Sequence, residues 1–327
     1  ILRIPFSIIA PVIVVICAVG AYTVHNKLLD VGMMIVFGVL GYAFKKLKYP
    51  LAPLVLALVL FPLIYVISAS FSSPGAVVRG AVWLLPVEPT LKGYEAVFKY
   101  PKIMTGFYNS FIYMISGTAL NLVMTMLCAY PLSRKEFKGR GVIRKLLVFT
   151  MYFSGGMVPT YMVVQKLGLV DTRLAMILPV ALSVWNVILC RTYIMSTIPD
   201  ALYEAASIDG SSPFGFMMQV VVPLSAPILA VLALYYGISH WNTYFNALIY
   251  LNSAALQPLQ IVLREILVQN KIDPTMIADV RELSEKQGLT DLLKYSVIVV
   301  ASVPVMCVYP FVQKYFVTGV MVGAVKG

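Results

Sequence analysis

The sequence predicts an all-α protein that crosses a membrane several times. Of its 327 residues, 60% are hydrophobic and only 12% are charged, whereas a soluble domain carries roughly 25% charged residues. The apolar residues gather in runs near the roughly 20 residues that a helix needs to cross a bilayer. A helix satisfies its own backbone hydrogen bonds in lipid, and runs of this length do not suit barrel strands.

Two apolar runs, 4–23 and 29–44, open the chain. Arg3 precedes the first run, as in a signal peptide, but no small-residue cleavage site follows and further spans come after it. We therefore expect a spanning helix at 4–23 and a shorter, second one at 29–44. Because the first residue is Ile1 rather than a methionine, we also expect the sequence to be a fragment or a processed form.

The remainder of the chain carries about six further spans. The apolar runs that predict them are 51–71, 106–131, 142–165, 173–195, 224–250 and 292–313. Between the last two runs, polar and apolar residues alternate at helical spacing around Ile261 and Glu265. This pattern predicts a short surface helix within 251–291, followed by a loop.

Basic residues orient these spans. The loop 132–145 carries six lysines and arginines against the single acid Glu136, and lysine and arginine mark the cytoplasmic side of a membrane. A second basic gap, 45–50, and the tail with Lys326 give the same orientation by alternation of the spans. The segment 196–223 and the C-terminus are therefore expected in the cytoplasm, with 72–105 and 251–291 outside.

Several function classes are excluded by the same composition. The net charge of +11 reflects the cytoplasmic loops, so nucleic-acid binding is not expected. The four cysteines lie within apolar runs and form no CxxC pair, which indicates neither a metal site nor a disulfide framework. No GxxxxGK[ST] motif occurs and no catalytic constellation is visible, so any ATP must be bound and hydrolysed elsewhere.

The segment 196–223 reads as a helix, a glycine turn and a second helix. Thr197, followed three residues later by Asp200, resembles an N-terminal capping pair. Gly210 suits the left-handed residue that ends a helix, and Ser212 before a proline suits a new helix start. One stripe of the first helix is apolar, and its members are Ala201, Leu202, Ala205 and Ile208.

The same segment resembles the EAA motif of permease subunits in bacterial ATP-binding-cassette (ABC) importers. Glutamate and alanine are good helix formers, so these three letters alone would fit any connecting helix. The longer register is more specific: Glu204, Ala205 and Ala206 are followed by Gly210 and, at the end of the motif, Pro223. The resemblance implies that this helix, including Asp209, docks on the ATPase subunit and transmits its closure to the spanning helices.

The resemblance covers the chain from about residue 61 to 327. It is carried by FPLIYVISASFSSP, NSFIYMISGTALNLVMTMLCAYPLSRKEFKGR, GGMVPTYMVVQKLGLVDT and VTGVMVGAVKG, which are similar to the MalG-like carbohydrate permeases of the LplC/YtcP group. It implies a type I ABC importer permease fold in a bacterial inner membrane. The implied partners are an ATPase dimer that binds the ATP, a second homologous permease, an extracytoplasmic solute-binding protein and a carbohydrate substrate. The permease itself needs no cofactor.

The first residues do not fit that family. The elements GAY, DVGMM, FGVLGY and YPLAPL within 3–60 are similar to the C-terminal part of the TctA membrane subunit of tricarboxylate transporters. We therefore expect an apparent fusion, with a TctA-like extension of two helices over 1–50 and the permease domain over 51–327.

A polar, aromatic stretch close to the end of a span, 235–250, is the candidate substrate path. Aromatic faces and hydrogen-bonding side chains hold sugars, and this stretch offers both in His240, Trp241, Asn242, Tyr244 and Asn246. The alternative is an interfacial aromatic belt or packing. Asn109, Asn121 and Asn186 are further polar residues in or beside spans, where they are expected to face the bundle interior.

The sequence thus predicts a permease subunit of an ATP-driven, binding-protein-dependent importer of carbohydrates, such as oligosaccharides. Two alternatives stay open at this point. The segment 3–60 would also fit a fragment of a secondary tricarboxylate transporter, and the whole chain would fit a membrane scaffold that transports nothing.

Overall fold

The computed structural model describes residues 46, 51–267, 288, 291–307 and 310. The chain divides into two units, residues 1–65 and 66–327. The first unit contains most of helix α3 (Leu51–Ser70), which has Pro62 in its interior and whose side chains are described from Val59 onwards. The predicted spans 4–23 and 29–44 lie outside the described residues.

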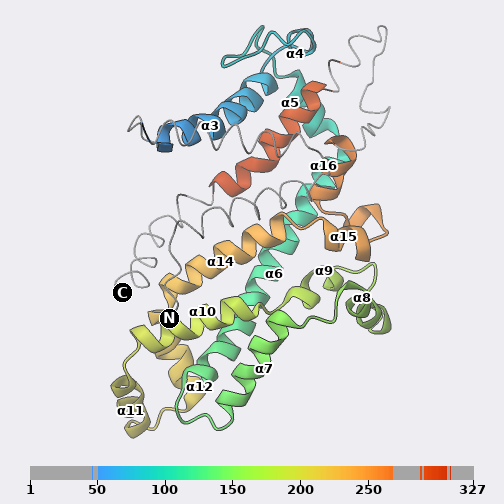
Figure 1. Cartoon of the computed structure of the whole chain (residues 1–327). Coiled ribbons are helices and arrows are strands. Elements are labelled where there is room, and N and C mark those ends of the chain that lie inside the picture. The colour runs from blue at the N-terminus through green and yellow to red at the C-terminus, as the bar shows by residue number, and fades with distance from the viewer. Residues whose placement is uncertain (1–45, 47–50, 268–287, 289–290, 308–309, 311–327) are drawn as a thin grey trace. The chain divides into compact units, whose positions relative to one another are not determined.

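Helices make up the second unit (Figure 1). In chain order they are α4 (Pro74–Val78), α5 (Lys92–Lys99), α6 (Pro101–Ser133), α7 (Arg140–Tyr152), α8 (Met157–Lys166), α9 (Leu174–Ile177), η1 (Leu178–Val180), α10 (Val184–Thr197), α11 (Asp200–Ile208), α12 (Pro213–Phe216), the π-helical turn η2 (Met217–Val221), α13 (Val222–Leu224), α14 (Ala226–Trp241), α15 (Phe245–Tyr250), η3 (Ala254–Leu256) and α16 (Leu259–Leu267). Residues 291–307 form a further helix.

Helix α6 confirms the span predicted at 106–131. With 33 residues it is about 50 Å long at 1.5 Å per residue, more than a bilayer core of about 30 Å requires. Among the described residues, α6 is the helix that is long and apolar enough to cross a membrane unbroken. The number of spans rises to four if each of three sharply bent helix pairs counts as one.

Two of the apolar runs predicted as continuous spans are instead pairs of helices separated by a sharp bend, and a third starts at such a bend. The run 142–165 bends by 114° between α7 and α8, and 173–195 bends by 54° before α10. The first break falls at Gly156, whose φ of 85° belongs to the left-handed region that glycine adopts at no steric cost. Helix α14, which follows a 79° bend, ends at Trp241 rather than continuing to 250 as predicted. Asn242 and Thr243 stand at this break, and such side chains compete for backbone hydrogen bonds and favour helix ends.

The predicted surface helix within 251–291 is present as α16, but it is not a surface helix. Leu259, Ile261, Val262, Leu263 and Ile266 are buried. All of them except Ile261 pack in a cluster with Val97 of α5, Ile103 of α6 and Leu293 and Val297 of the helix at 291–307. Ile261 packs in another cluster, which includes Tyr113 of α6 and Met176 of α9. A strongly amphipathic short helix thus covers the core in place of facing solvent.

A second apolar cluster lies around the C-terminal half of α6. It joins α6 to α10, α12 and α14, with Tyr130, Cys190, Phe216 and Leu232 among its buried members. Helix α6 contacts α14, α10 and α16, so it passes through both clusters. This arrangement is visible in Figure 1, where α6 crosses behind α10 and α14 and reaches α16 with its N-terminal half.

A buried polar bridge joins α6 to two neighbours. The Asn121 amide nitrogen donates to the carbonyl of Val180 at 2.6 Å, and its Oδ1 lies 2.7 Å from His240 Nε2 of α14. Gly117 makes room for this contact, because a Cβ at that position would collide with the His240 ring. Asn109, Asn121 and Asn186 are all buried, which confirms that they face the interior.

Two glycine substitutions test how closely α6 and α14 must approach. Gly117→Ala would push into His240, whereas Gly237→Ala on α14 would place its Cβ 3.8 Å from Met114 and Thr118, an ordinary contact. Overpacking typically costs about 1–3 kcal/mol, so Gly117→Ala should lower the thermal unfolding midpoint in detergent and Gly237→Ala should barely change it. Equal midpoints for the two variants would contradict the proposed close approach.

Candidate functional site

The segment 196–223 begins with a proline break. Helix α10 continues to Thr197, Ile198 is extended, and α11 starts at Asp200 with Pro199 in the N-cap position. The predicted capping pair is therefore wrong, since Thr197 belongs to α10 and no side chain caps α11. The reason is local. Steric clash with Pro199 drives the preceding residue, Ile198, out of the helical region of backbone angles, so α10 ends at Thr197.

A glycine turn ends α11, as predicted. Gly210 has a φ of 78°, and the backbone N–H of Ser211 donates to the carbonyl of Ala206 at 2.8 Å. The Ser212 hydroxyl then accepts from the backbone N–H of Gly215 at 3.0 Å and caps α12. The predicted sequence of helix, glycine turn and helix is confirmed.

The end of the segment is reshaped by Pro223. It lies in the single turn α13, which follows the π-helical turn η2 and precedes the 79° bend to α14. Proline lacks the N–H that would continue the hydrogen-bond ladder, so a widened turn and a change of direction follow. Pro223 is exposed and connects the segment to a spanning helix.

The two faces of α11 differ. Tyr203 and Ala206 pack partly buried against the cluster around the C-terminal half of α6. The predicted apolar stripe points the other way and is exposed, with Leu202 at 42% and Ile208 at 87% exposure. Of the predicted motif residues, Ala206 is half-buried, and the others are exposed: Glu204, Ala205, Asp209, Gly210 and Pro223.

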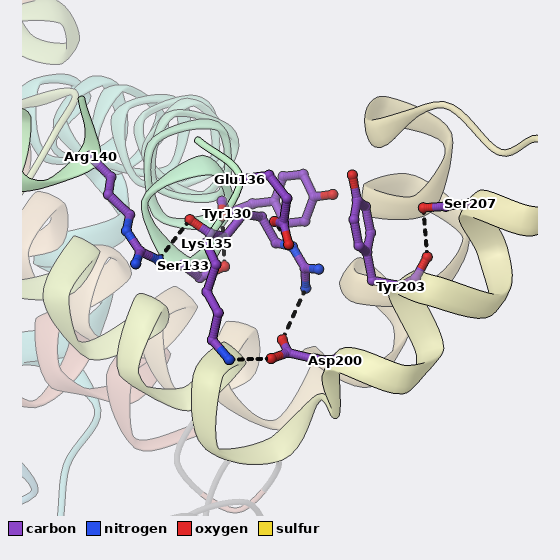
Figure 2. A network of polar contacts seen from close by, with 9 residues as sticks. Tyr130, Ser133, Lys135, Glu136, Arg140, Asp200, Tyr203 and Ser207 are labelled. Atoms are coloured by element: carbon purple, nitrogen blue, oxygen red, sulfur yellow. Dashed lines mark hydrogen bonds and ion pairs between the residues drawn. The ribbon is translucent and has the colours of Figure 1, made fainter. Parts of the chain in front are cut away.

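Residues of the basic loop hold the first turn of α11. Lys135 Nζ donates to Asp200 Oδ2 at 2.7 Å, and Figure 2 shows these two side chains pointing toward each other. Arg134 Nη1 lies 3.9 Å from Asp200 Oδ1, and its Cζ lies 3.8 Å from the centre of the Tyr203 ring. The sequence singled out these arginine and lysine residues only as markers of membrane side, so it missed their contact with α11.

This contact perturbs both partners of the exposed ion pair. The hydrogen bond from Lys135 and its positive charge hold the pKa of Asp200 below its usual range, and Arg134 adds to the effect. The same hydrogen bond and the charge of Asp200 raise the pKa of Lys135. Both groups are therefore charged throughout the neutral range.

The five candidate substrate-path residues do not form one constellation. His240 and Trp241 are buried in the last turn of α14; Trp241 Nε1 donates to the carbonyl of Ala301 at 3.3 Å, while its ring packs on Phe107 and Phe111. Asn242 and Tyr244 are exposed beyond the helix end, and Asn246 is half-buried in α15. The first two residues therefore make packing contacts, and a substrate-path role for any of the five stays a prediction.

Comparison of the sequence with known protein families assigns the chain to one of them. Residues 122–322 match the sequence profile described as "Binding-protein-dependent transport system inner membrane component". The chain belongs to this family. A second, short match over residues 1–56 is to the tripartite tricarboxylate transporter TctA family.

Individual relatives agree with the family. The chain is 38% identical to Protein LplC of Bacillus subtilis over 83% of its own length and 90% of that protein. It is 40% identical to the polygalacturonan/rhamnogalacturonan transport system permease protein YtcP of the same organism, over 81% and 92% of the two chains. A solved bacterial ABC transporter involved in the import of the acidic polysaccharide alginate superposes with a TM-score of 0.75 at 32% identity, covering 86% and 96%.

The family fixes the general function. This binding-protein-dependent inner membrane component is a transmembrane permease subunit of an ATP-driven importer of carbohydrates. The predicted all-α permease fold is confirmed by the same superposition, and the resemblance to the LplC/YtcP group is confirmed by the sequence identities.

The Asp200–Lys135 pair predicts a pH-dependent anchoring of α11. Because the folded-state pKa of Asp200 is depressed, the pair stabilises the folded arrangement above the ordinary aspartate pKa, about 3.9, and this contribution is lost as pH falls through the depressed value. Hydrogen–deuterium exchange of residues 200–208, corrected for intrinsic rates, should therefore quicken on acidification to about pH 3.

One variant removes the Asp200 carboxylate, and a second serves as a matched control. Asp200→Asn at neutral pH should exchange in 200–208 as the acidified protein does, and should lose the added pH dependence. Asp291→Asn removes another aspartate that pairs with a lysine, Lys294 at 3.0 Å, and should leave 200–208 unchanged. Identical exchange in all three proteins would show that the pair does not anchor α11.

Proposed function

We propose that α11 is the coupling element of this permease and docks on a separate ATPase subunit. The observation that carries the proposal is the exposed stripe of Leu202, Ala205 and Ile208 on a helix whose opposite face packs on the chain. A large exposed apolar patch rimmed by polar groups is typical of a protein interface. The rim is acidic here, since Glu204 of the helix and Asp209, the residue that follows its end, are both exposed.

The small side chains of the motif fit this role. Ala205 keeps the exposed face of α11 narrow, so that another backbone can approach it closely, and Ala206 lets the opposite face pack closely on the chain. Gly210 lets the chain turn away immediately afterwards. The full sequence contains no phosphate-binding loop, which supports ATP binding and hydrolysis by the partner and no cofactor on this chain.

The complete importer would contain this chain, a second homologous permease, two ATPase subunits and an extracytoplasmic solute-binding protein. Segment 196–223 and the C-terminus would then lie in the cytoplasm, as the basic loops indicate. Closure of the two ATPase subunits would rock the permeases as rigid bodies and open the path alternately to either side.

Gly210 provides a test of coupling. Its φ of 78° is unfavourable for a β-branched residue by about 1–2 kcal/mol or more, whereas asparagine tolerates this region. Nothing lies within 4 Å of an added Cβ, so the conformation alone is tested. Gly210→Val should reduce carbohydrate uptake by about tenfold with normal membrane insertion, and Gly210→Asn should stay near wild type. Unchanged uptake in Gly210→Val would argue against a coupling role for this turn.

For the substrate, we propose an acidic oligosaccharide built from uronic acids. Support comes from two relatives whose names refer to acidic polysaccharides, a polygalacturonan/rhamnogalacturonan permease and an alginate importer. Asn242, Tyr244 and Asn246 would contact the sugar, because they lie beyond the packed end of α14 and are exposed or half-buried, whereas His240 and Trp241 hold that end in place.

Uptake of oligogalacturonides tests this function directly. A host strain that lacks the chain should lose uptake of labelled oligogalacturonides and regain it with the wild-type gene, while arabino-oligosaccharides serve as a neutral comparison. Pull-down of the tagged chain should recover an ATPase and a second permease. Preserved oligogalacturonide uptake in the deletion strain would refute the proposed substrate, and recovery of no ATPase would refute the proposed assembly.

The match of residues 1–56 to the TctA family supports a chain of two parts, an extension over 1–50 and a permease domain over 51–327. If the extension is an addition, removal of residues 1–50 should preserve oligogalacturonide uptake. Loss of all uptake with retained assembly would instead favour a transport role for the extension, as in a tricarboxylate carrier.

A further inference from the structure

Arg134 occupies an unusual position for a loop arginine. It directly follows Ser133, the last residue of α6, and its side chain is only 10% exposed. Its Cζ lies 3.8 Å from the centre of the Tyr203 ring and 5.9 Å from that of Phe216. Two carboxylates complete the surroundings, Glu136 at 3.4 Å from Nε and Asp200 at 3.9 Å from Nη1.

Arginine is suited to this place in a way that lysine is not. Its planar guanidinium stacks on an aromatic face while its edge still reaches carboxylates. Because the group is almost withdrawn from water, its interactions are screened less than those of an exposed pair. Lys135 contacts the same Asp200 at 2.7 Å, but its side chain is 70% exposed, and exposed ion pairs contribute little.

The backbone beneath Arg134 is held on several sides. Its N–H donates to the carbonyl of Pro131 at 3.1 Å, and its own carbonyl accepts from Arg140 Nη1 of α7 at 3.0 Å. The neighbouring carbonyl of Leu132 accepts from Arg191 Nε of α10 at 2.8 Å. A side chain mounted on so fixed a backbone transmits a displacement rather than absorbing it by its own motion.

Helix α11 is connected to its neighbouring helices in two different ways. Helix α11 is linked through the chain to α10 on one side and to α12 on the other. Helix α6 is instead reached from α11 by side-chain contact, and it packs along α14, α10 and α16. Through its contacts with Asp200 and Tyr203, Arg134 stands where a shift of α11 passes to α6, the longest helix among the described residues. Figure 2 shows Ser133, at the end of α6, near Asp200 and Tyr203 of α11.

We propose that Arg134 is a positioning residue for coupling. Its guanidinium holds α11 against the C-terminal end of α6, so that displacement of α11 by the ATPase moves α6 as well. The inference rests on the proposed docking of α11 on an ATPase subunit. It adds a residue outside the EAA motif, contributed by the preceding cytoplasmic loop.

The test compares uptake with ATP hydrolysis in the assembled importer. The complex is purified through the tagged chain and placed in proteoliposomes, and phosphate release and uptake of labelled oligogalacturonides are measured together. Arg134→Gln should keep ATPase association and hydrolysis but lower the sugar transported per ATP by about tenfold, within the usual range of coupling factors. Arg134→Lys, which keeps the charge without the planar stack, should fall between Arg134→Gln and wild type.

Matched variants separate positioning from folding. Tyr203→Phe keeps the ring beneath the guanidinium and should behave as wild type. Tyr203→Leu removes the ring and should reproduce the lowered ratio of Arg134→Gln. The double variant Arg134→Gln/Tyr203→Leu should be no worse than either single variant. Lys135→Gln removes the exposed partner of Asp200 but keeps the Arg134 guanidinium on the Tyr203 ring, so it should lower the ratio less than Arg134→Gln does. If Arg134→Gln does not reach the membrane, the Tyr203 pair decides.

Three outcomes overturn the inference while the proposed function stands. A wild-type ratio in Arg134→Gln does so, as does equal behaviour of the two Tyr203 variants. Loss of ATPase from the Arg134→Gln complex would assign the residue to docking or folding instead. If the wild-type chain itself recovers no ATPase, the proposed function fails and the inference falls with it. A failure of the inference alone leaves wild-type assembly and uptake intact.

Discussion

Hydrogen bonds from buried side chains of α6 are the interaction on which the permease part of this chain depends. Lipid tails are as apolar as leucine, so helices in a bilayer associate through close packing and polar contacts, each worth about 0.6–2 kcal/mol. Helix α6 makes such contacts along its length. Asn109 and Tyr113 bind carbonyls of 255–257, Asn121 binds His240 and Val180, and Thr125 lies 2.8 Å from the Tyr236 hydroxyl.

These contacts explain why the other spans can be broken. The bends between α7 and α8, before α10 and before α14 interrupt backbone ladders, and interrupted backbone in a membrane must find partners within the protein. The carbonyl of Val180, at one of these breaks, is satisfied by Asn121 of α6. An unbroken helix with buried polar side chains thus supplies a hydrogen-bond partner to a broken neighbour.

Polar contacts also hold the C-terminal end of α6, at the surface where we propose that coupling takes place. Arg134 follows the last residue of α6 and contacts Asp200 and Tyr203 of α11. One face of α11 is therefore tied to the spanning helices, while the other presents Leu202 and Ile208. An element that passes motion between two bodies needs a firm contact with each. The packed face of α11 supplies one of these contacts, and the exposed face is where we propose the other.

The sequence by itself determined the features that depend on local physics. Charge content and run length defined a helical membrane protein, the Glu204–Pro223 register indicated the permease family, and Gly210 marked a turn because few other residues adopt its backbone angles. The burial of Asn109, Asn121 and Asn186 also followed, since polar groups avoid lipid. The capping of α11 was misread because Pro199 overrides the Thr197 signal.

Only the tertiary structure decided which side chains meet across long sequence separations. Arg134 and Tyr203 are 69 positions apart in the chain, so no local pattern distinguishes this arginine from the exposed Lys135 beside it. The same holds for His240 and Trp241, which look like sugar ligands in sequence but are buried among packing partners from α6 and residues near 301. Burial and pairing depend on how distant elements pack, and that information is spread over the whole fold.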